Sequence, residues 1–242
     1  MDDRNLPIEI NRESLPKHMA IIMQGSSVWA KNNHQTIEEA YSKRFRIVLE
    51  VMKMQADLKV PVISFYLLPE VKKPIQDPQR VMAKLDSLSE FLMNLKSSEI
   101  IHKNGIKITV LGRWYDLPGR IVDSIKEITS ETKDYDSYFV NLFINYDGQQ
   151  EIVDAVRVIG MKIKSGRLDP NMIDKQAIKD ELYTSYFMPP ELIIRTGTHH
   201  RLRGFLLWDS IDATIYFSNK LWPDISCDDL IRAIRYHQNM QG

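Results

Sequence analysis

The sequence predicts a single α/β domain, residues 1–242, with a mainly parallel central sheet flanked by helices. Short apolar runs, typical of buried strands, alternate along the chain with stretches in which apolar residues recur at helical spacing. A chain of 242 residues can build one well-packed core, and no linker rich in Pro, Gly or Ser divides it. Residues 1–16 are polar and are expected to form a loosely ordered N-terminal segment.

Short apolar runs mark the predicted strands. The first of them is apolar throughout, as is typical of a strand that is buried on both faces of a parallel sheet. The third alternates at first between apolar and polar residues, and the fourth and fifth each end in a turn of small or polar residues. The predicted strands are 19–23, 60–67, 106–111, 138–145, 192–195 and 211–217, the last as a final core strand.

Helices are expected between these strands, because apolar residues there recur every three or four positions. Strands that alternate with helices favour a parallel sheet, and we expect helices on both of its faces. The predicted helices begin at Trp29 or Thr36, span 78–104 and 117–132, and begin again at Gln150, with a small helical insertion opening at 168–170.

The charge balance of the chain excludes several classes of partner. Lys+Arg 32 and Asp+Glu 32 give a net charge of +0, so no overall attraction to nucleic acid or to anionic lipid is expected. Cys227 is the one cysteine, which excludes an intrachain disulfide and a cysteine-built metal site. Without a signal peptide or a long apolar run, the protein is expected in the cytoplasm, with at most peripheral membrane contact.

Three arginines near the end of the fifth strand predict an anion site. Arg195 ends an apolar run and is followed by Thr196–Thr198, so it should lie at the carboxyl end of a central strand, where open α/β sheets bind ligands. Arg201 and Arg203 follow closely, and three guanidiniums repel one another unless an anion such as diphosphate lies among them. A solvated basic loop is the alternative, but the apolar stretch Phe205–Trp208 argues against full exposure.

The turn after the first strand is a second candidate anion site. Gln24, Gly25, Ser26 and Ser27 follow the strand and precede a predicted helix. A strand, a turn of small residues and a helix N-terminus together can cradle a phosphate on backbone N–H groups.

Several motifs give the chain a family resemblance. They are HMAIIM at 18–23, WAK at 29–31, NYDGQQEI at 145–152, and RTG-x-x-x-R-x-x-x-F-L-L-W with IYFSNKLWPD in 195–224. Together they resemble the cis-prenyltransferases, the Z-type polyprenyl diphosphate synthases related to undecaprenyl diphosphate synthase. The resemblance covers almost the whole chain and implies two diphosphate sites, one for an allylic donor and one for an isopentenyl acceptor.

The resemblance also shows which positions have changed. In the family, an Asp in the first turn holds Mg²⁺ on the donor diphosphate, and Gln24 stands in its place, so no intact catalytic residue is expected. Thr214 aligns with a metal-binding Glu of the family. We therefore expect no metal site and no cofactor, with Mg²⁺ only if the altered site still functions. The former donor site comprises Gly25, Ser26, Ser27, Val28, Ile37 and Tyr41, and it is expected to have lost its charge.

The acceptor-like site is better preserved. The resemblance implies that Arg195, Arg201 and Arg203 bind diphosphate, with Lys73 in the 69–74 loop and His200 as further contacts. For Lys73 a solvated loop lysine is the alternative, and for His200 a hydrogen-bonded loop residue. The family walls a hydrophobic tunnel with the region that corresponds to 78–104, so a tunnel is expected beside the sheet, although ordinary core packing gives the same pattern.

Two functions from different classes fit these changes. The first is a non-catalytic subunit of a heteromeric prenyltransferase, paired with a catalytic homologue. The second is an active but non-standard transferase or cyclase, which performs irregular coupling or alcohol prenylation through the arginine cluster. A small-molecule binder without turnover is a third possibility. The expected partners are a prenyl diphosphate or a related apolar molecule, and a second chain in a homodimer or heterodimer.

Overall fold

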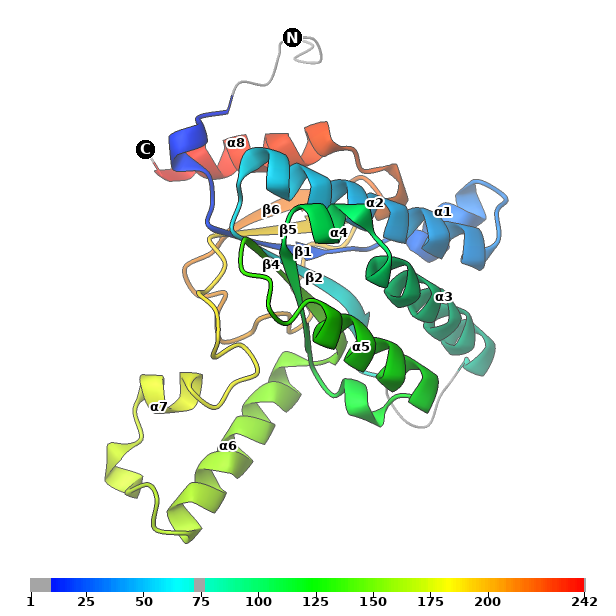
Figure 1. Cartoon of the computed structure of the whole chain (residues 1–242). Helices are drawn as coiled ribbons and strands as arrows, with labels where there is room; N and C mark the ends of the chain where they lie inside the picture. The colour runs from blue at the N-terminus through cyan, green and yellow to red at the C-terminus, as the bar shows by residue number, and fades with distance from the viewer. Residues whose placement is uncertain (1–9, 72–76, 242) are drawn as a thin grey trace.

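A six-stranded parallel sheet forms the centre of the computed structural model, which describes residues 10–71 and 77–241 (Figure 1). The strand order is β3-β4-β2-β1-β5-β6, and every neighbouring pair runs parallel. This arrangement confirms the predicted fold class. The strands are β1 (His18–Ile22), β2 (Val62–Pro69), β3 (Ile106–Leu111), β4 (Tyr138–Tyr146), β5 (Leu192–Thr196) and β6 (Thr214–Ser218).

Strand β1 lies inside the sheet, between β2 and β5. Met19 is in register with Ile63 of β2 and with Leu192 of β5, and all five residues of β1 are buried. Burial on both faces explains why this segment is apolar without alternation. The chain leaves β1 toward β2 on one side, whereas β5 lies on the other side, so the carboxyl ends of β1 and β5 form a topological switch point, where such sheets bind ligands.

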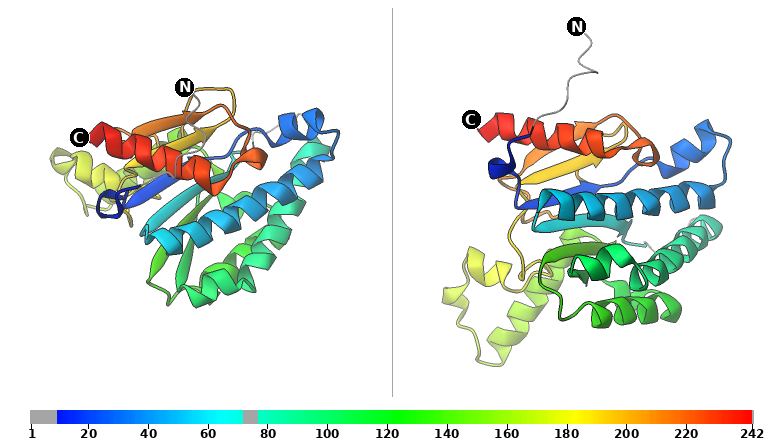
Figure 2. Two further views of the ribbon diagram at one scale, coloured as in Figure 1. Left: turned by 90° about the horizontal axis from the view of Figure 1, so that it is seen from above. Right: turned by 45° about the horizontal axis from the view of Figure 1, so that its top comes forward.

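One face of the sheet is covered by helices (Figure 2). Met19 and Ile21 belong to an apolar cluster with residues of α2, α3, α5 and α8. Among the described residues, none of the helices has the length and apolarity needed to cross a bilayer. The helices are α1 (Ser26–Asn32), α2 (Ile37–Leu58), α3 (Pro78–Lys96), α4 (Glu99–Lys103), α5 (Gly119–Glu131), α6 (Gly148–Lys164), α7 (Lys175–Lys179) and α8 (Cys227–Gln241), with 3-10 turns at Arg12–Ser14, Trp114–Asp116, Pro170–Met172 and Trp222–Asp224.

Local capping explains where several helices begin. Thr36 and Glu39 form a reciprocal capping box at the start of α2, and Asp77 accepts a hydrogen bond from the Arg80 backbone at the start of α3. The prediction of one helix over 78–104 is wrong, because α3 ends at Lys96 and α4 begins at Glu99. Ser98, between them, is extended, and serine favours helix ends over helix interiors.

The opposite face of the sheet differs from the prediction. Ala20 and Ile22 pack there against Phe205 and Leu206, which come from the irregular segment before β6. Helices α6 and α7 instead extend away from the sheet (Figure 1). The expectation of helices on both faces is therefore wrong for this face. The last strand also differs, because β6 forms an edge of the sheet and all of its residues are partly exposed.

The two ends of the described chain lie together (Figure 1). Gln238 of α8, a helix that was not predicted, donates its amide N–H to the backbone oxygens of Asn11 (2.6 Å) and Ser14 (3.1 Å). Residues 10–16 are therefore fixed to the body of the domain, which corrects the expectation of loose order for that part of the 1–16 segment. The remainder of the segment, residues 1–9, lies outside the described residues.

Candidate functional site

A cavity of about 310 Å³ lies at the carboxyl ends of β1 and β5. Its walls come from the turn after β1, from α2 and α3, and from the loop after β5. Met23, Phe45 and Leu88 give it an apolar side. The cationic side chains that line it are Arg44, Arg80, Lys84, Arg201 and Arg203, and none of the described residues in its lining is an Asp or a Glu. The lining of the cavity therefore combines positive charge with an apolar wall.

The rim of the cavity is held by contacts between two turns. The backbone N–H of Gln24 donates to Thr196 Oγ1 (2.9 Å), and the carbonyl of Gln24 accepts from the Trp222 N–H (2.8 Å). Gly25 has a φ of 112°, and a Cβ atom there would lie 2.7 Å from Leu221, so this position requires glycine. Gln24 is thus fixed beside the end of β5.

Arg195 lies where the sequence predicts, at the carboxyl end of β5, but it is fully buried and is not part of the cavity lining. Its Nε donates to the backbone oxygen of His199. Burial, together with the charges of Arg203 and Arg201, lowers the pKa of Arg195 to about 10. Its two terminal nitrogens have no hydrogen-bond partner among the described residues, so the guanidinium has unused capacity for an anion.

The loop after β5 carries the other predicted contacts. Arg201 and Arg203 line the cavity, as expected for an anion site, and Arg203 has the left-handed φ of 53°. His200 does not line the cavity; its Nε2 lies 3.2 Å from Asn219 Oδ1, and its neighbour His199 takes the lining position. Lys73 lies outside the described residues, so its predicted role stays a prediction.

The former donor site forms the opposite side of the same cavity. Gly25, Ser26, Ser27, Val28 and Tyr41 all line it. Ile37 does not, because it packs against the apolar cluster of Trp29, Ala30 and Ala40. Ser26 is buried, and its Oγ has no hydrogen-bond partner among the described residues. Five of the six predicted positions therefore meet at one place.

Sequence reasoning missed three cations on this side. Arg80 Nη2 donates to Ser27 Oγ at 2.5 Å, so α3 reaches across the cavity to α1. Lys84 lies one turn further along, and burial and the charges of Arg80 and Arg44 lower its pKa. Arg44 is buried in α2, where Nη2 donates to the backbone oxygens at the end of β2. The expectation that the donor side has lost its charge is therefore wrong.

The spacing of Arg80, Lys84 and Leu88 was the available signal for these residues. Positions four apart lie on one face of a helix, and all three line the cavity. Phe91 and Leu92 of α3 are buried in the main apolar cluster, whereas Leu85 belongs to that cluster and also borders a second cavity. Phe91 stacks on Phe45 with ring centroids 4.4 Å apart.

Phe91 and Leu92 expose only 2% and 1% of their surface, so this part of α3 is core rather than cavity wall. A separate cavity of about 750 Å³ lies at another face of α3. Val81 and Met82 line it, together with Leu117 and Arg113.

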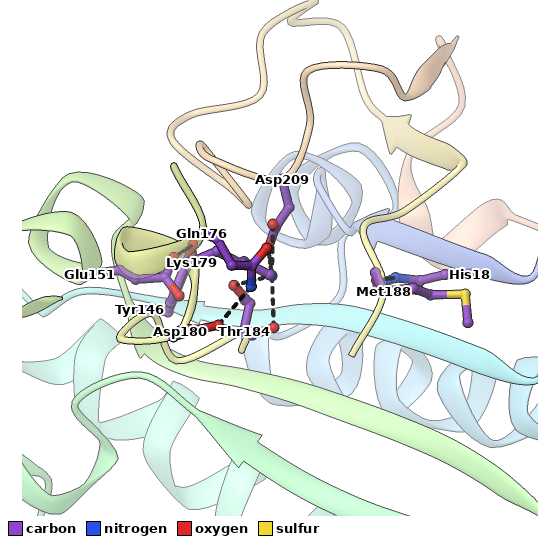
Figure 3. A network of polar contacts seen from close by, with 9 residues as sticks. All are labelled: His18, Tyr146, Glu151, Gln176, Lys179, Asp180, Thr184, Met188 and Asp209. Carbon is purple, nitrogen blue, oxygen red and sulfur yellow. Dashed lines mark hydrogen bonds and ion pairs between the residues drawn. The ribbon is translucent and has the colours of Figure 1, made fainter. Parts of the chain in front are cut away.

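A second group of buried polar residues lies outside the cavity lining (Figure 3). Lys179 Nζ donates to both carboxylate oxygens of Asp209, at 2.7 and 2.9 Å, and to the Thr184 backbone oxygen at 2.8 Å. Glu151 Oε2 accepts from the Tyr146 hydroxyl at 2.6 Å, and burial raises the pKa of Glu151 to about 7. We refer to these five residues as the Lys179 network.

Figure 3 also shows His18, a buried residue of β1. It is fully buried, and burial lowers the pKa of His18 to about 4, so the ring is neutral near pH 7. Nδ1–H donates to the Met188 backbone oxygen (2.7 Å), and Nε2 accepts from the Ser64 hydroxyl (2.8 Å). Both ring nitrogens are satisfied, so His18 ties β1 to β2 and to the segment before β5 rather than serving a ligand.

An anion site at a switch point of a parallel sheet, beside an apolar wall, is the kind of site that a diphosphate-using transferase needs. Residues 22–242 match the family described as "Putative undecaprenyl diphosphate synthase", and the chain belongs to this isoprenyl transferase family. This result confirms the resemblance predicted from the sequence motifs.

Two relatives show how far the similarity extends. The chain is 33% identical over 240 residues to the "Tritrans,polycis-undecaprenyl-diphosphate synthase (geranylgeranyl-diphosphate specific)" of Methanocaldococcus jannaschii, covering 96% of this chain and 83% of the relative. It is 32% identical to the "Isoprenyl transferase" of Prochlorococcus marinus, covering 97% and 85%. The lavandulyl diphosphate synthase of Lavandula x intermedia, solved with dimethylallyl diphosphate, superposes with a TM-score of 0.88 at 26% identity, covering 93% of this chain and 96% of that one.

The residues present do not fit the magnesium that the family resemblance implies. Mg²⁺ in proteins is normally anchored by one or two carboxylates. Gln24 offers a neutral amide, and Thr214 lies on β6, where its hydroxyl pairs with His237 at 2.9 Å rather than lining the cavity. Nowhere in residues 10–71 and 77–241 do three His, Cys, Asp or Glu side chains gather as a metal site would require. No step of a mechanism is therefore assigned to a metal.

Proposed function

We propose that this protein is a prenyltransferase that uses short prenyl diphosphates, bound in the cavity at the ends of β1 and β5. The proposal rests on the composition of the cavity lining, which combines arginine and lysine side chains with the apolar side chains of Met23, Phe45 and Leu88. A diphosphate head group would lie among the cations, and its hydrocarbon tail would lie against the apolar side.

The size of the cavity favours a short tail. Ligand pockets usually measure about 300–1,000 Å³, and this one measures about 310 Å³, with Phe45 in its lining stacked on the buried Phe91. The M. jannaschii relative is named for geranylgeranyl diphosphate, a longer substrate, whereas the lavender relative was solved with dimethylallyl diphosphate. The lining of this cavity supports the shorter substrate class for this chain.

The chemistry that the site supports is ionisation of an allylic diphosphate. The bond between the allylic carbon and the diphosphate oxygen breaks, and the diphosphate leaves with the electron pair. Guanidinium and ammonium groups that are already in place stabilise the charge that develops on the leaving group. The allylic carbon then forms a bond to a double bond or a hydroxyl group of an acceptor, which loses a proton.

The test is to incubate the purified protein with dimethylallyl, geranyl, farnesyl and geranylgeranyl diphosphates, each with an isoprenoid diphosphate or alcohol acceptor. We expect product and released diphosphate with the two shorter donors. Phe45→Ala should extend activity to the longer donors, because it removes the ring that closes the cavity. Absence of both binding and product with every donor would overturn the proposal.

A second candidate is a non-catalytic subunit of a heteromeric prenyltransferase. Gln24 at the family Asp position favours it, because that residue cannot carry the usual charge. Within residues 10–71 and 77–241, strand β6 pairs on one side only and its residues are partly exposed, and Tyr236 and Met240 of α8 are exposed as well. A second copy or a catalytic homologue would cover this surface. Product formation by this chain alone would exclude the non-catalytic role, and a monomeric mass in light scattering would exclude the homodimer.

A further inference from the structure

We infer that helix α3 supplies a diphosphate subsite that works without a divalent metal. Arg80 and Lys84 are its cations, and Ser26 and Ser27 of α1 complete it. The inference rests on the proposed function, because the anion in question is the head group of a prenyl diphosphate. It assigns binding to two residues outside the motifs that carry the family resemblance.

Geometry places these groups on opposite walls of one space. Arg80 spans the cavity to donate to Ser27 Oγ. Lys84 follows on the same face of α3 and lines the same cavity, and Arg44 approaches from α2. Among the described residues, neither Arg80 nor Lys84 forms an ion pair with a carboxylate. Like charges gathered in this way gain most when an anion binds between them.

An unpartnered buried atom is a second, independent sign of an anion. Ser26 Oγ has no hydrogen-bond partner among the described residues, although Ser26 is 5% exposed and lines the cavity. A buried hydroxyl without a partner is rare in proteins, and a phosphate oxygen bound in the cavity would satisfy it.

The charge of the cavity argues against a metal in the same place. A diphosphate carries several negative charges, which are usually neutralised in part by Mg²⁺ that one or two carboxylates hold in place. Here Arg44, Arg80 and Lys84 take the place of the metal, and Arg201 and Arg203 line the same cavity. Adding a divalent cation would bring further positive charge into a lining without a carboxylate, so the cations on α3 replace the metal rather than assist it.

The experiment is a calorimetric titration of the full chain with inorganic pyrophosphate in EDTA and, separately, in excess MgCl₂. We expect binding in EDTA that Mg²⁺ does not tighten. Arg80→Ala and Lys84→Met should each weaken it about 10- to 100-fold, the effect of one lost charged hydrogen bond. Lys84→Arg should retain most of the affinity, which separates charge from packing. Lys96→Ala is the matched control, because Lys96 is an exposed cation at the far end of the same helix.

Binding that requires Mg²⁺, or wild-type affinity in both Arg80→Ala and Lys84→Met, would overturn the inference. Arg80 is exposed, so its variant should fold, and thermal unfolding of each variant verifies this. The outcomes separate this inference from the proposed function. Turnover of prenyl diphosphates only with Mg²⁺ would overturn the metal-free subsite but support the transferase function. Pyrophosphate binding without metal, but with no turnover of any prenyl diphosphate, would support the subsite and overturn the transferase function.

Discussion

The cavity and the Lys179 network both gather charged side chains, but they balance charge in different ways. In the network, Lys179 and Asp209 are paired directly, with side-chain exposures of 15% and 2% (Figure 3). In the cavity, arginines and lysine meet without a carboxylate among the described lining residues. The charges of a buried ion pair neutralise each other within the fold, whereas cations without a carboxylate partner can bind an anion from solution. Pairing therefore distinguishes a structural cluster from a binding cluster.

Lys179→Ala should give the largest effect on stability. The substitution leaves the Asp209 carboxylate buried without its partner, and breaking a buried pair costs about 3–5 kcal/mol. Urea unfolding measures this cost. The control is Lys103→Ala, which breaks an exposed pair with Glu99 and should cost about 1 kcal/mol or less. If the two variants lose the same stability, the buried pair of Lys179 and Asp209 contributes no more to the fold than an exposed pair does.

The pH dependence of stability tests the network a second way. Because the folded pKa of Glu151 is raised to about 7 from 4.5, the folded state holds a proton that the unfolded state releases, and stability falls as pH rises from 4.5 through 7. This loss amounts to about 3 kcal/mol. Tyr146, Asp209 and Lys179 are the neighbouring titratable groups.

His18 acts in the opposite direction. Its folded pKa is lowered from 6.5 to about 4, so its contribution is present above pH 6.5 and is lost as pH falls through 4. Glu151→Gln should abolish the decline between pH 5 and 8 and leave the loss below pH 6.5. Urea unfolding at four pH values distinguishes the contribution of Glu151 from that of His18. An unchanged decline in Glu151→Gln would show that another group causes it.

Two buried arginines should respond to substitution with opposite signs. Arg195→Met removes two unpartnered nitrogens and should stabilise the anion-free protein by roughly 1–3 kcal/mol. Arg44→Met should destabilise by a similar amount, because Nη2 of Arg44 satisfies the backbone oxygens of Tyr66 and Leu67. Thermal unfolding with and without pyrophosphate is the measurement. We expect pyrophosphate to stabilise Arg195→Met less than the wild type, and destabilisation of Arg195→Met without anion would contradict the argument.

The site residues that lie at the ends of strands could be predicted from the sequence. Arg195 follows an apolar run and precedes a glycine turn, so its place at a strand end is a local property. The same holds for Gln24 after β1. Periodicity alone could not show that Arg80 and Lys84 face this turn, because that depends on how α3 packs against α1 and α2.

The errors in the prediction of the fold have local and tertiary causes. Ser97 and Ser98 interrupt a periodic apolar pattern that continues on both sides, so one helix was predicted where two exist. Strand β6 carries apolar residues like a core strand, yet among the described residues it pairs only with β5 and lies at the edge of the sheet, which its composition does not show. The cover of the second sheet face by residues of 183–187 and 202–206, rather than by helices, also depends on long-range packing.

The most direct test of the central claim is a crystal structure with dimethylallyl S-thiolodiphosphate, an uncleavable substrate analogue, grown in EDTA. We expect the diphosphate oxygens within hydrogen-bond distance of Arg80 and Lys84, and the prenyl tail against Phe45, with no metal required. A diphosphate that is seen only in crystals containing Mg²⁺, bound at Gln24 and away from α3, would contradict the claim.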